Sequence, residues 1–88
     1  MYWLKILEIT PKNHFALFER NDGEFGWLEM LMGDVEVGDI LNEMKDKDFL
    51  KCKAMYCYKG KTQVRIAING FGFEDDMRKE IKLYDNRI

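Results

Sequence analysis

The amino-acid sequence predicts a mainly β protein with minor α structure: a small antiparallel barrel of five to six strands that ends in one helix. Two observations predict the barrel, namely short runs rich in β-branched and aromatic residues and the polar turns that separate them. A third predicts the helix, because apolar residues near the C-terminus recur at helical spacing. A chain of 88 residues corresponds to one domain, 1–88, with a thin core.

The first three expected strands form a meander with short loops. Tyr2–Thr10 is the first strand, and Pro11–Asn13 ends it. The second strand, His14–Arg20, has apolar residues on both faces, so we expect it to be covered on two sides. Asn21–Glu24 predicts a tight hairpin turn because its Asp-Gly pair supplies a positive φ, and Phe25–Met32 then returns as the third strand.

The segment after this meander has two interpretations. Gly33–Asp39 is expected to be a loop with a short extended piece. Ile40–Lys47 could form one helical turn capped by the preceding Asp39. Alternatively, Ile40 and Leu41 could end a short strand. We favour the helical turn.

The longest regular element is a predicted β-hairpin over Phe49–Asn69. Its strands are Phe49–Tyr58 and Thr62–Asn69, joined by a turn at Lys59–Lys61. The second strand places its β-branched residues on one face, which we expect to be the core face: Val64, Ile66 and Ile68.

Gly70–Phe73 is expected to end this hairpin, and Glu74–Tyr84 to form the C-terminal helix. Acidic residues crowd the first helical turn and basic residues follow, as the helix dipole favours. Met77, Ile81 and Tyr84 give the helix a narrow apolar stripe. The order of elements is that of an OB-like or an SH3-like barrel, an architectural analogy that carries no function with it.

Charge is distributed unevenly along the chain. The formal net charge is −2, which argues against binding of nucleic acid by bulk charge alone. Residues 1–48 carry five Lys/Arg and eleven Asp/Glu, whereas residues 49–88 carry nine and five. This division can mark a partner surface, or the two halves can simply attract each other in the folded protein.

The cysteines and the hydropathy predict a cytoplasmic protein. Cys52 and Cys57 are five residues apart on one expected strand, about 16 Å, which is too far for a disulfide. Two free thiols with no signal peptide ahead of them fit a reducing compartment. The longest uncharged run, Ile66–Phe73, has eight residues, so we expect no transmembrane helix and no membrane partner.

No catalytic or metal-binding motif stands out, so we expect no enzyme activity, no cofactor and no metal. His14 is the single histidine, and any Ser-His-acid or Cys-His arrangement would depend on it. A remote alternative is a carboxylate-based active site, which would need at least two acidic residues in one pocket. The candidates are Glu29, Asp34, Glu36 and Asp39.

The predicted function is therefore binding, first of all to another protein, as an adaptor or an inhibitor. Twelve aromatic residues and six methionines are many for one small core, and Trp, Tyr and Met are enriched at protein interfaces. Trp27 follows a turn tip, where we expect an aromatic side chain to be exposed. The residues predicted to bind protein are Phe25, Trp27, Trp3 and Met30.

The alternative function is single-stranded nucleic-acid binding along the basic hairpin, which would combine cations with aromatic platforms for bases. The residues predicted for it are Lys51, Lys53, Lys59, Lys61, Arg65, Phe71 and Phe73. Tyr56 and Tyr58 have the opposite parity to Lys51 and Lys53, which suggests core or rim positions. The same lysines could instead protect an edge strand from aggregation. An exposed strand edge could also pair with a second copy as a homodimer.

Overall fold

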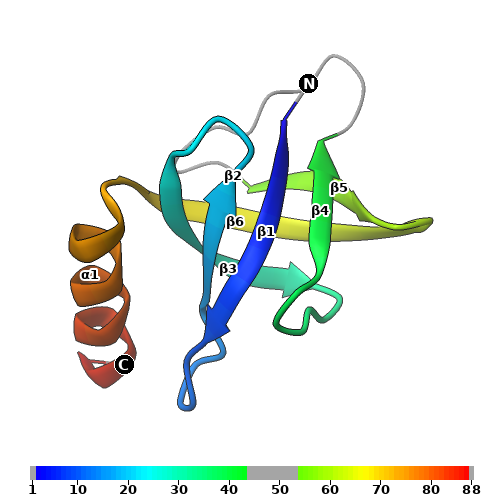
Figure 1. Ribbon diagram of the computed structural model, residues 1–88. Coiled ribbons are helices and arrows are strands. Elements are labelled where there is room, and N and C mark those ends of the chain that lie inside the picture. Colours follow the sequence, from blue (N-terminus) through cyan, green and yellow to red (C-terminus); the bar gives the residue numbers. More distant parts are fainter. Residues whose placement is uncertain (1, 44–53, 88) are drawn as a thin grey trace.

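A computed structural model describes residues 2–43 and 54–87, which form a closed six-stranded antiparallel barrel and one C-terminal helix (Figure 1). The strand order around the barrel is β1-β2-β3-β6-β5-β4. The elements are β1 (Trp3–Ile9), β2 (Ala16–Arg20), β3 (Phe25–Met32), β4 (Ile40–Glu43), β5 (Ala54–Lys59), β6 (Thr62–Gly72) and α1 (Glu74–Arg87). The predicted fold class is confirmed, while the finer choice between OB-like and SH3-like closure stays a prediction.

The barrel interior is filled by alternate residues of all six strands. On β6, Val64, Ile66 and Ile68 are buried in one cluster, as the period-2 pattern predicts. Each large apolar side chain buried in this way stabilises the fold by about 1.5–3 kcal/mol. The cluster consists of Leu4, Ile6, Ala16, Phe18, Leu28, Leu41, Cys57, Val64, Ile66 and Ile68.

Strand β2 is covered on both faces, which confirms the prediction from its two apolar sides. Ala16 and Phe18 point into the barrel, whereas Leu17 and the preceding Phe15 lie in a second cluster outside it. Helix α1 forms the cover on that outer side (Figure 1). The turn that follows β2 is also as predicted: Gly23 has a φ of 88°.

Helix α1 docks through the predicted apolar stripe. Met77 and Ile81 are buried against Phe15, Leu17 and Trp27. Three acidic residues occupy its first turn, where the positive end of the helix dipole favours them. Neither α1 nor any other helix in the described ranges has the length and apolar run needed to cross a bilayer.

The preferred helical turn at Ile40–Lys47 is wrong for its described part, because Ile40–Glu43 is strand β4. It pairs with β1 on one side and β5 on the other, and so closes the barrel. Asp39 does not cap a helix: its carboxylate accepts a hydrogen bond of 2.8 Å from the backbone N–H of Glu36. Hydrogen bonding to two distant strands outweighs the local capping signal. Residues 44–47 and the expected strand start at 49–53 lie outside the described residues.

Strand β6 continues three residues past the predicted end at Asn69. The glycines of β6 do not end the strand. They allow β3 to approach it closely. A Cβ atom at Gly70 would lie 2.8 Å from the indole Nε1 of Trp27. A register shift between Trp27 and Leu28 accommodates the close approach.

Each of the six described strands pairs with two neighbours. The exposed strand edge that the homodimer alternative requires is therefore absent from this part of the chain.

Candidate functional site

Helix α1 covers only one side of the barrel, where it contacts β2, β3 and β6. The outer surface of the start of β1, of β4 and β5 and of the start of β6 lies away from the helix (Figure 1). Residues that alternate with the buried core positions point outward there. We call this surface the uncovered face; it comprises Trp3, Lys5, Ile40, Asn42, Tyr56, Tyr58, Gln63 and Arg65.

One row of side chains crosses the uncovered face from strand to strand. Trp3 is paired with Asn42, Asn42 with Tyr58, and Tyr58 with Gln63. Neighbouring strands are about 4.8 Å apart, so the row extends across roughly 14 Å. Trp3 is 38% exposed and Tyr58 is 37% exposed, which leaves two aromatic surfaces accessible to a partner.

A second row runs beside the first. Tyr56 is paired with Arg65, and Arg65 with Met32 on β3. The guanidinium carbon of Arg65 lies 5.6 Å from the centroid of the Tyr56 ring, a cation–π contact worth about 0.5–1 kcal/mol at an exposed site. This contact holds the Arg65 side chain in place before any partner arrives.

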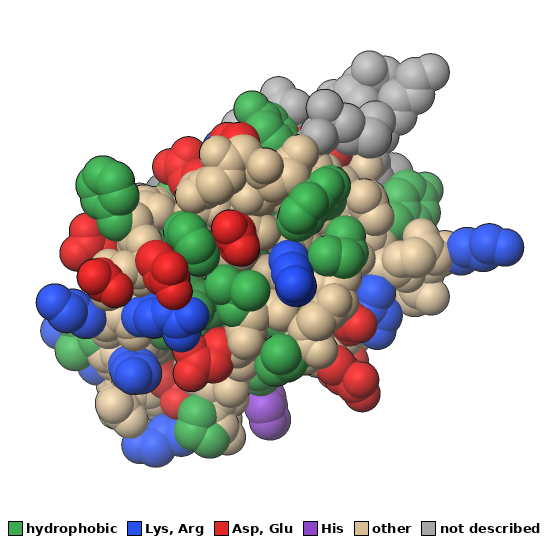
Figure 2. Space-filling model, viewed as in Figure 1, with side chains coloured by type: hydrophobic (Ala, Val, Ile, Leu, Met, Phe, Trp, Pro, Cys, Tyr) green, Lys and Arg blue, Asp and Glu red, His purple; other side chains and the backbone are tan. Residues whose placement is uncertain are grey.

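The charges of the uncovered face are of one sign. Lys5 and Arg65 are its charged members, and none of its eight residues is acidic. Figure 2 shows hydrophobic side chains on the surface over β1 and β4, whereas acidic and basic side chains are mixed over α1. The uncovered face is thus aromatic, and Arg65 is its cation without an acidic cross-strand partner, because Lys5 is paired with Glu19 on β2.

The expectation that Trp27 is exposed is wrong. Its side chain is 2% exposed, its ring lies 5.0 Å from that of Phe15, and its indole N–H donates to Glu80 Oε1 at 3.0 Å. Although Trp27 follows the β2–β3 turn, it is not exposed to solvent, because α1 packs over its side chain. Trp27 therefore belongs to the packing between helix and barrel, and the version of the protein-binding prediction that depends on it fails.

The four residues predicted to bind protein do not form one surface. Phe25 is half-buried beside the cluster under α1, and Met30 is half-buried against the barrel core. Of the four, Trp3 lies on the uncovered face.

The residues predicted to bind nucleic acid are divided between the two ends of β6. Lys61 lies in the turn before β6 and Phe71 near its other end, roughly 30 Å apart along the strand. Lys59 is half-buried, and its Nζ donates to the carbonyl oxygen of Asp34 at 2.6 Å. Arg65 lies on the uncovered face. Lys51 and Lys53 lie outside the described residues.

The two phenylalanines of that set have different surroundings. Phe71 is half-buried under the guanidinium of Arg20, whose carbon lies 4.9 Å from the ring centroid. Phe73 is 82% exposed and lines a hollow with Asp22 and Glu24, which are acidic neighbours unsuited to a phosphate backbone. Neither ring shares a surface with Arg65.

Of the four carboxylates considered for an active site, two share one hollow, which is the minimum that the carboxylate alternative requires, so this alternative stays a prediction. Asp34 and Glu36 line one hollow beside His14, and both are exposed. Glu29 lines a different hollow next to α1, and Asp39 is engaged with the backbone of Glu36. In the described ranges, no group of three or more His, Cys, Asp and Glu residues is placed to hold a metal ion.

From the sequence, Tyr56 and Tyr58 are possible aromatic platforms but are assigned to core or rim positions, and Asn42 is not singled out. The signal that could have found them is parity: Cys57, between the two tyrosines, is fully buried, so both tyrosines point outward. Comparisons of the chain with protein-family models, with curated proteins and with solved structures find no match.

Proposed function

We propose that this protein is a non-enzymatic binding module that acts through protein–protein interaction, as an adaptor or an inhibitor, and that the uncovered face is its binding surface. The observation that carries the proposal is the paired row Trp3–Asn42–Tyr58 with Tyr56 and Arg65 beside it. Trp, Tyr and Arg are the residues most enriched among interface hot spots, and acidic residues are depleted there. These side chains project from paired strands of a closed barrel, so ordering them on binding costs little entropy.

The charge of the uncovered face points to an acidic partner segment. Arg65, held against Tyr56, presents a planar guanidinium that suits bidentate contact with a carboxylate. Lys5 lies on the same face and could pair with a second acidic group of the partner. An apolar side chain between these two acidic groups could contact Trp3, Ile40 and Tyr58. The partner segment we propose therefore combines Asp or Glu with apolar residues.

The test is selection of a displayed random peptide library against the protein, followed by anisotropy titration of the peptides that enrich. We expect enriched peptides to contain both acidic and apolar residues. Tyr58→Ala should weaken their binding by about 30-fold, the effect of a hot spot worth about 2 kcal/mol. Arg65→Glu should weaken acidic peptides further, because it places like charges together.

The matched control is Leu83→Ala, which removes an exposed apolar side chain, 51% accessible, from the helix on the other side of the molecule. It should leave peptide binding unchanged. Enrichment of basic peptides, or equal binding to wild type and Tyr58→Ala, would overturn the proposal.

Single-stranded nucleic acid is the second candidate, favoured by one specific observation: the face combines three aromatic rings with Lys5 and Arg65 and no acid. Aromatic platforms contribute about 1–3 kcal/mol per stacked base. A labelled mixed-sequence strand, titrated at low and at physiological salt, separates the two proposals. Salt-sensitive binding that persists at physiological salt and disappears in Arg65→Glu would replace the protein partner by nucleic acid.

A further inference from the structure

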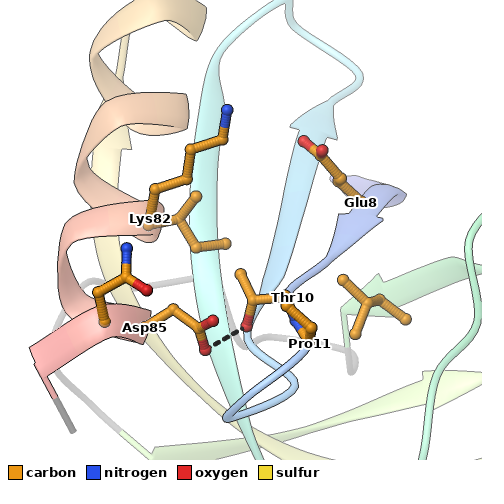
Figure 3. Close-up of a pocket in the computed structure, with 8 residues that line it drawn as sticks. Glu8, Thr10, Pro11, Lys82 and Asp85 are labelled. Atoms are coloured by element: carbon orange, nitrogen blue, oxygen red, sulfur yellow. Dashed lines mark hydrogen bonds between the residues drawn. The ribbon is translucent and has the colours of Figure 1, made fainter.

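A cleft lies between α1 and the end of β1, on a different part of the molecule from the uncovered face (Figure 3). Its volume is about 260 Å³, just below the range of pockets that take drug-sized ligands. It shares no residue with the uncovered face. The residues that line it are Glu8, Ile9, Thr10, Pro11, Ile81, Lys82, Asp85 and Asn86.

The acidic group at one end of this cleft is already fully engaged. The carboxylate of Asp85 accepts hydrogen bonds from the Thr10 hydroxyl at 2.7 Å and the Asn13 backbone N–H at 2.8 Å. The Asn13 side-chain amide and the Lys12 backbone N–H donate to it at 3.1 and 3.3 Å. Three of these four donors bond Oδ1, so this oxygen is occupied by contacts that connect α1 to the β1–β2 loop.

The acidic group at the other end is ion-paired, with an arginine that also pairs with Glu74. Glu8 Oε2 lies 2.7 Å from Arg78 Nη1, in an ion pair between β1 and α1. Lys82 extends from the opposite wall toward the same end of the cleft (Figure 3). Among residues 2–43 and 54–87, no salt bridge joins Lys82 to a carboxylate. The cleft lining thus has one hydrogen-bonded acid, one ion-paired acid and one lysine without a salt bridge among the described residues.

The cleft is also amphiphilic, because three of its lining residues are apolar: Ile9, Pro11 and Ile81. Pro11 lies beside Thr10 at the Asp85 end of the cleft (Figure 3), and Ile9 and Ile81 complete its apolar lining. Liquid water occupies about 30 Å³ per molecule, so the space corresponds to roughly nine waters and suits a ligand with about ten non-hydrogen atoms.

We propose that this cleft binds a small monocarboxylate with an apolar body. The carboxylate pairs with Lys82 Nζ, and the apolar body lies against Ile9, Pro11 and Ile81. Lys82 favours an anion over a cation at its end of the cleft, since among the described residues no carboxylate forms a salt bridge with it. The inference does not depend on the protein-binding role proposed for the uncovered face.

The test is an NMR titration of the ¹⁵N-labelled protein with three ligands of equal chain length: hexanoate, hexan-1-ol and hexylammonium. For hexanoate we expect saturable shifts of the Thr10, Lys82 and Asn86 amides, with a dissociation constant on the order of 1 mM for so small a ligand. The alcohol and the ammonium ion should bind at least about tenfold more weakly, since a hydrogen bond to a charged group is lost.

Variants of two lysines on α1 give the matched comparison. Lys82→Gln should weaken hexanoate binding by about tenfold, and Lys82→Arg should retain it. Lys79→Gln removes a charge from an exposed lysine that does not line the cleft, and should have no effect. Equal shifts with hexanoate and hexylammonium, or hexanoate binding that is unchanged in Lys82→Gln, would overturn the proposal.

Discussion

The carboxylate of Asp85 in the last turn of α1 accepts a hydrogen bond of 2.7 Å from the hydroxyl of Thr10 at the end of β1. The same hydroxyl oxygen accepts a hydrogen bond of 2.9 Å from the backbone N–H of Phe15, so Thr10 connects the helix to the start of β2. An acidic residue near a helix C-terminus is disfavoured by the helix dipole. The hydrogen bonds that Asp85 accepts from the β1–β2 loop offset this unfavourable interaction. The Asp85–Thr10 hydrogen bond therefore fixes the position of the C-terminal end of α1 on the barrel.

Thr10→Val should lower the free energy of unfolding. Both side chains of the pair are buried, and the near-isosteric change removes the hydroxyl while leaving Asp85 and the Phe15 N–H without their partner. Thr10→Ser keeps the hydroxyl and is the matched control. In urea unfolding, the midpoint of Thr10→Ser should be close to that of wild type, and the midpoint of Thr10→Val should be clearly below both. Equal midpoints for valine and serine would mean that the hydroxyl contributes nothing.

Acid should weaken the connection made by Asp85. Burial alone would raise the pKa of Asp85, but the hydrogen bonds from Thr10 and from Asn13 outweigh it and hold the pKa below its ordinary value. The folded state therefore binds fewer protons than the unfolded state below the ordinary carboxyl pKa of about 3.9. The contribution is fully present above that pH and is lost as pH falls through the lower folded-state value.

The measurement is the urea midpoint of wild type and Asp85→Asn at pH 7, 4 and 3. We expect wild type to be more stable at pH 7 and the difference to shrink toward pH 3. A difference that stays constant across this range would show that the charge of Asp85 is not what stabilises the fold.

Where the sequence predicts the structure well, the deciding contacts are local. The alternation of Val64, Ile66 and Ile68 is a property of one strand, and the Asp22-Gly23 turn forms within four residues, so both are visible without knowing the fold. The apolar stripe of α1 is local in the same sense.

The errors concern residues whose surroundings come from distant parts of the chain. Ile40–Glu43 forms a strand because β1 and β5 pair with it. Its four residues are too few for hydrophobic periodicity to distinguish a strand from a helix. Trp27 is buried by α1, which begins 47 residues later. Trp3, Asn42 and Tyr58 come together through register across three strands, which sequence spacing alone does not contain.

Trp27→Ala should destabilise the docking of α1 strongly. The substitution removes a large buried side chain and the hydrogen bond to Glu80, and such truncations cost about 3–5 kcal/mol. Trp3→Ala removes the partly exposed tryptophan and should cost less. Thermal unfolding monitored by circular dichroism compares the two. A Trp27→Ala protein as stable as Trp3→Ala would contradict the packing described here.

Gly26→Ala should be among the most damaging small substitutions in the barrel. A Cβ atom there would lie 2.4 Å from the carbonyl oxygen of Gly70 and 2.4 Å from Phe18 Cζ, so backbone must move. Overpacking of this kind typically costs about 1–3 kcal/mol. At Gly72 the nearest atom is the flexible Met77 Cε at 3.3 Å, so Gly72→Ala is the matched control and should be better tolerated. Equal unfolding midpoints for both variants would refute the steric argument.

Cys57 should resist alkylation as long as the barrel is folded. Its side chain is fully buried between β4 and β6, and burial raises the pKa of the thiol to about 12. Because the thiolate is the reactive form, iodoacetamide at pH 8 should modify the folded protein slowly and the urea-unfolded protein rapidly. A Cys52→Ser background makes the reaction report Cys57 alone, and mass spectrometry over time measures it. Labelling at the same rate with and without urea would show that the β4–β5 side of the barrel opens readily, and that the uncovered face is less rigid than its pairing implies.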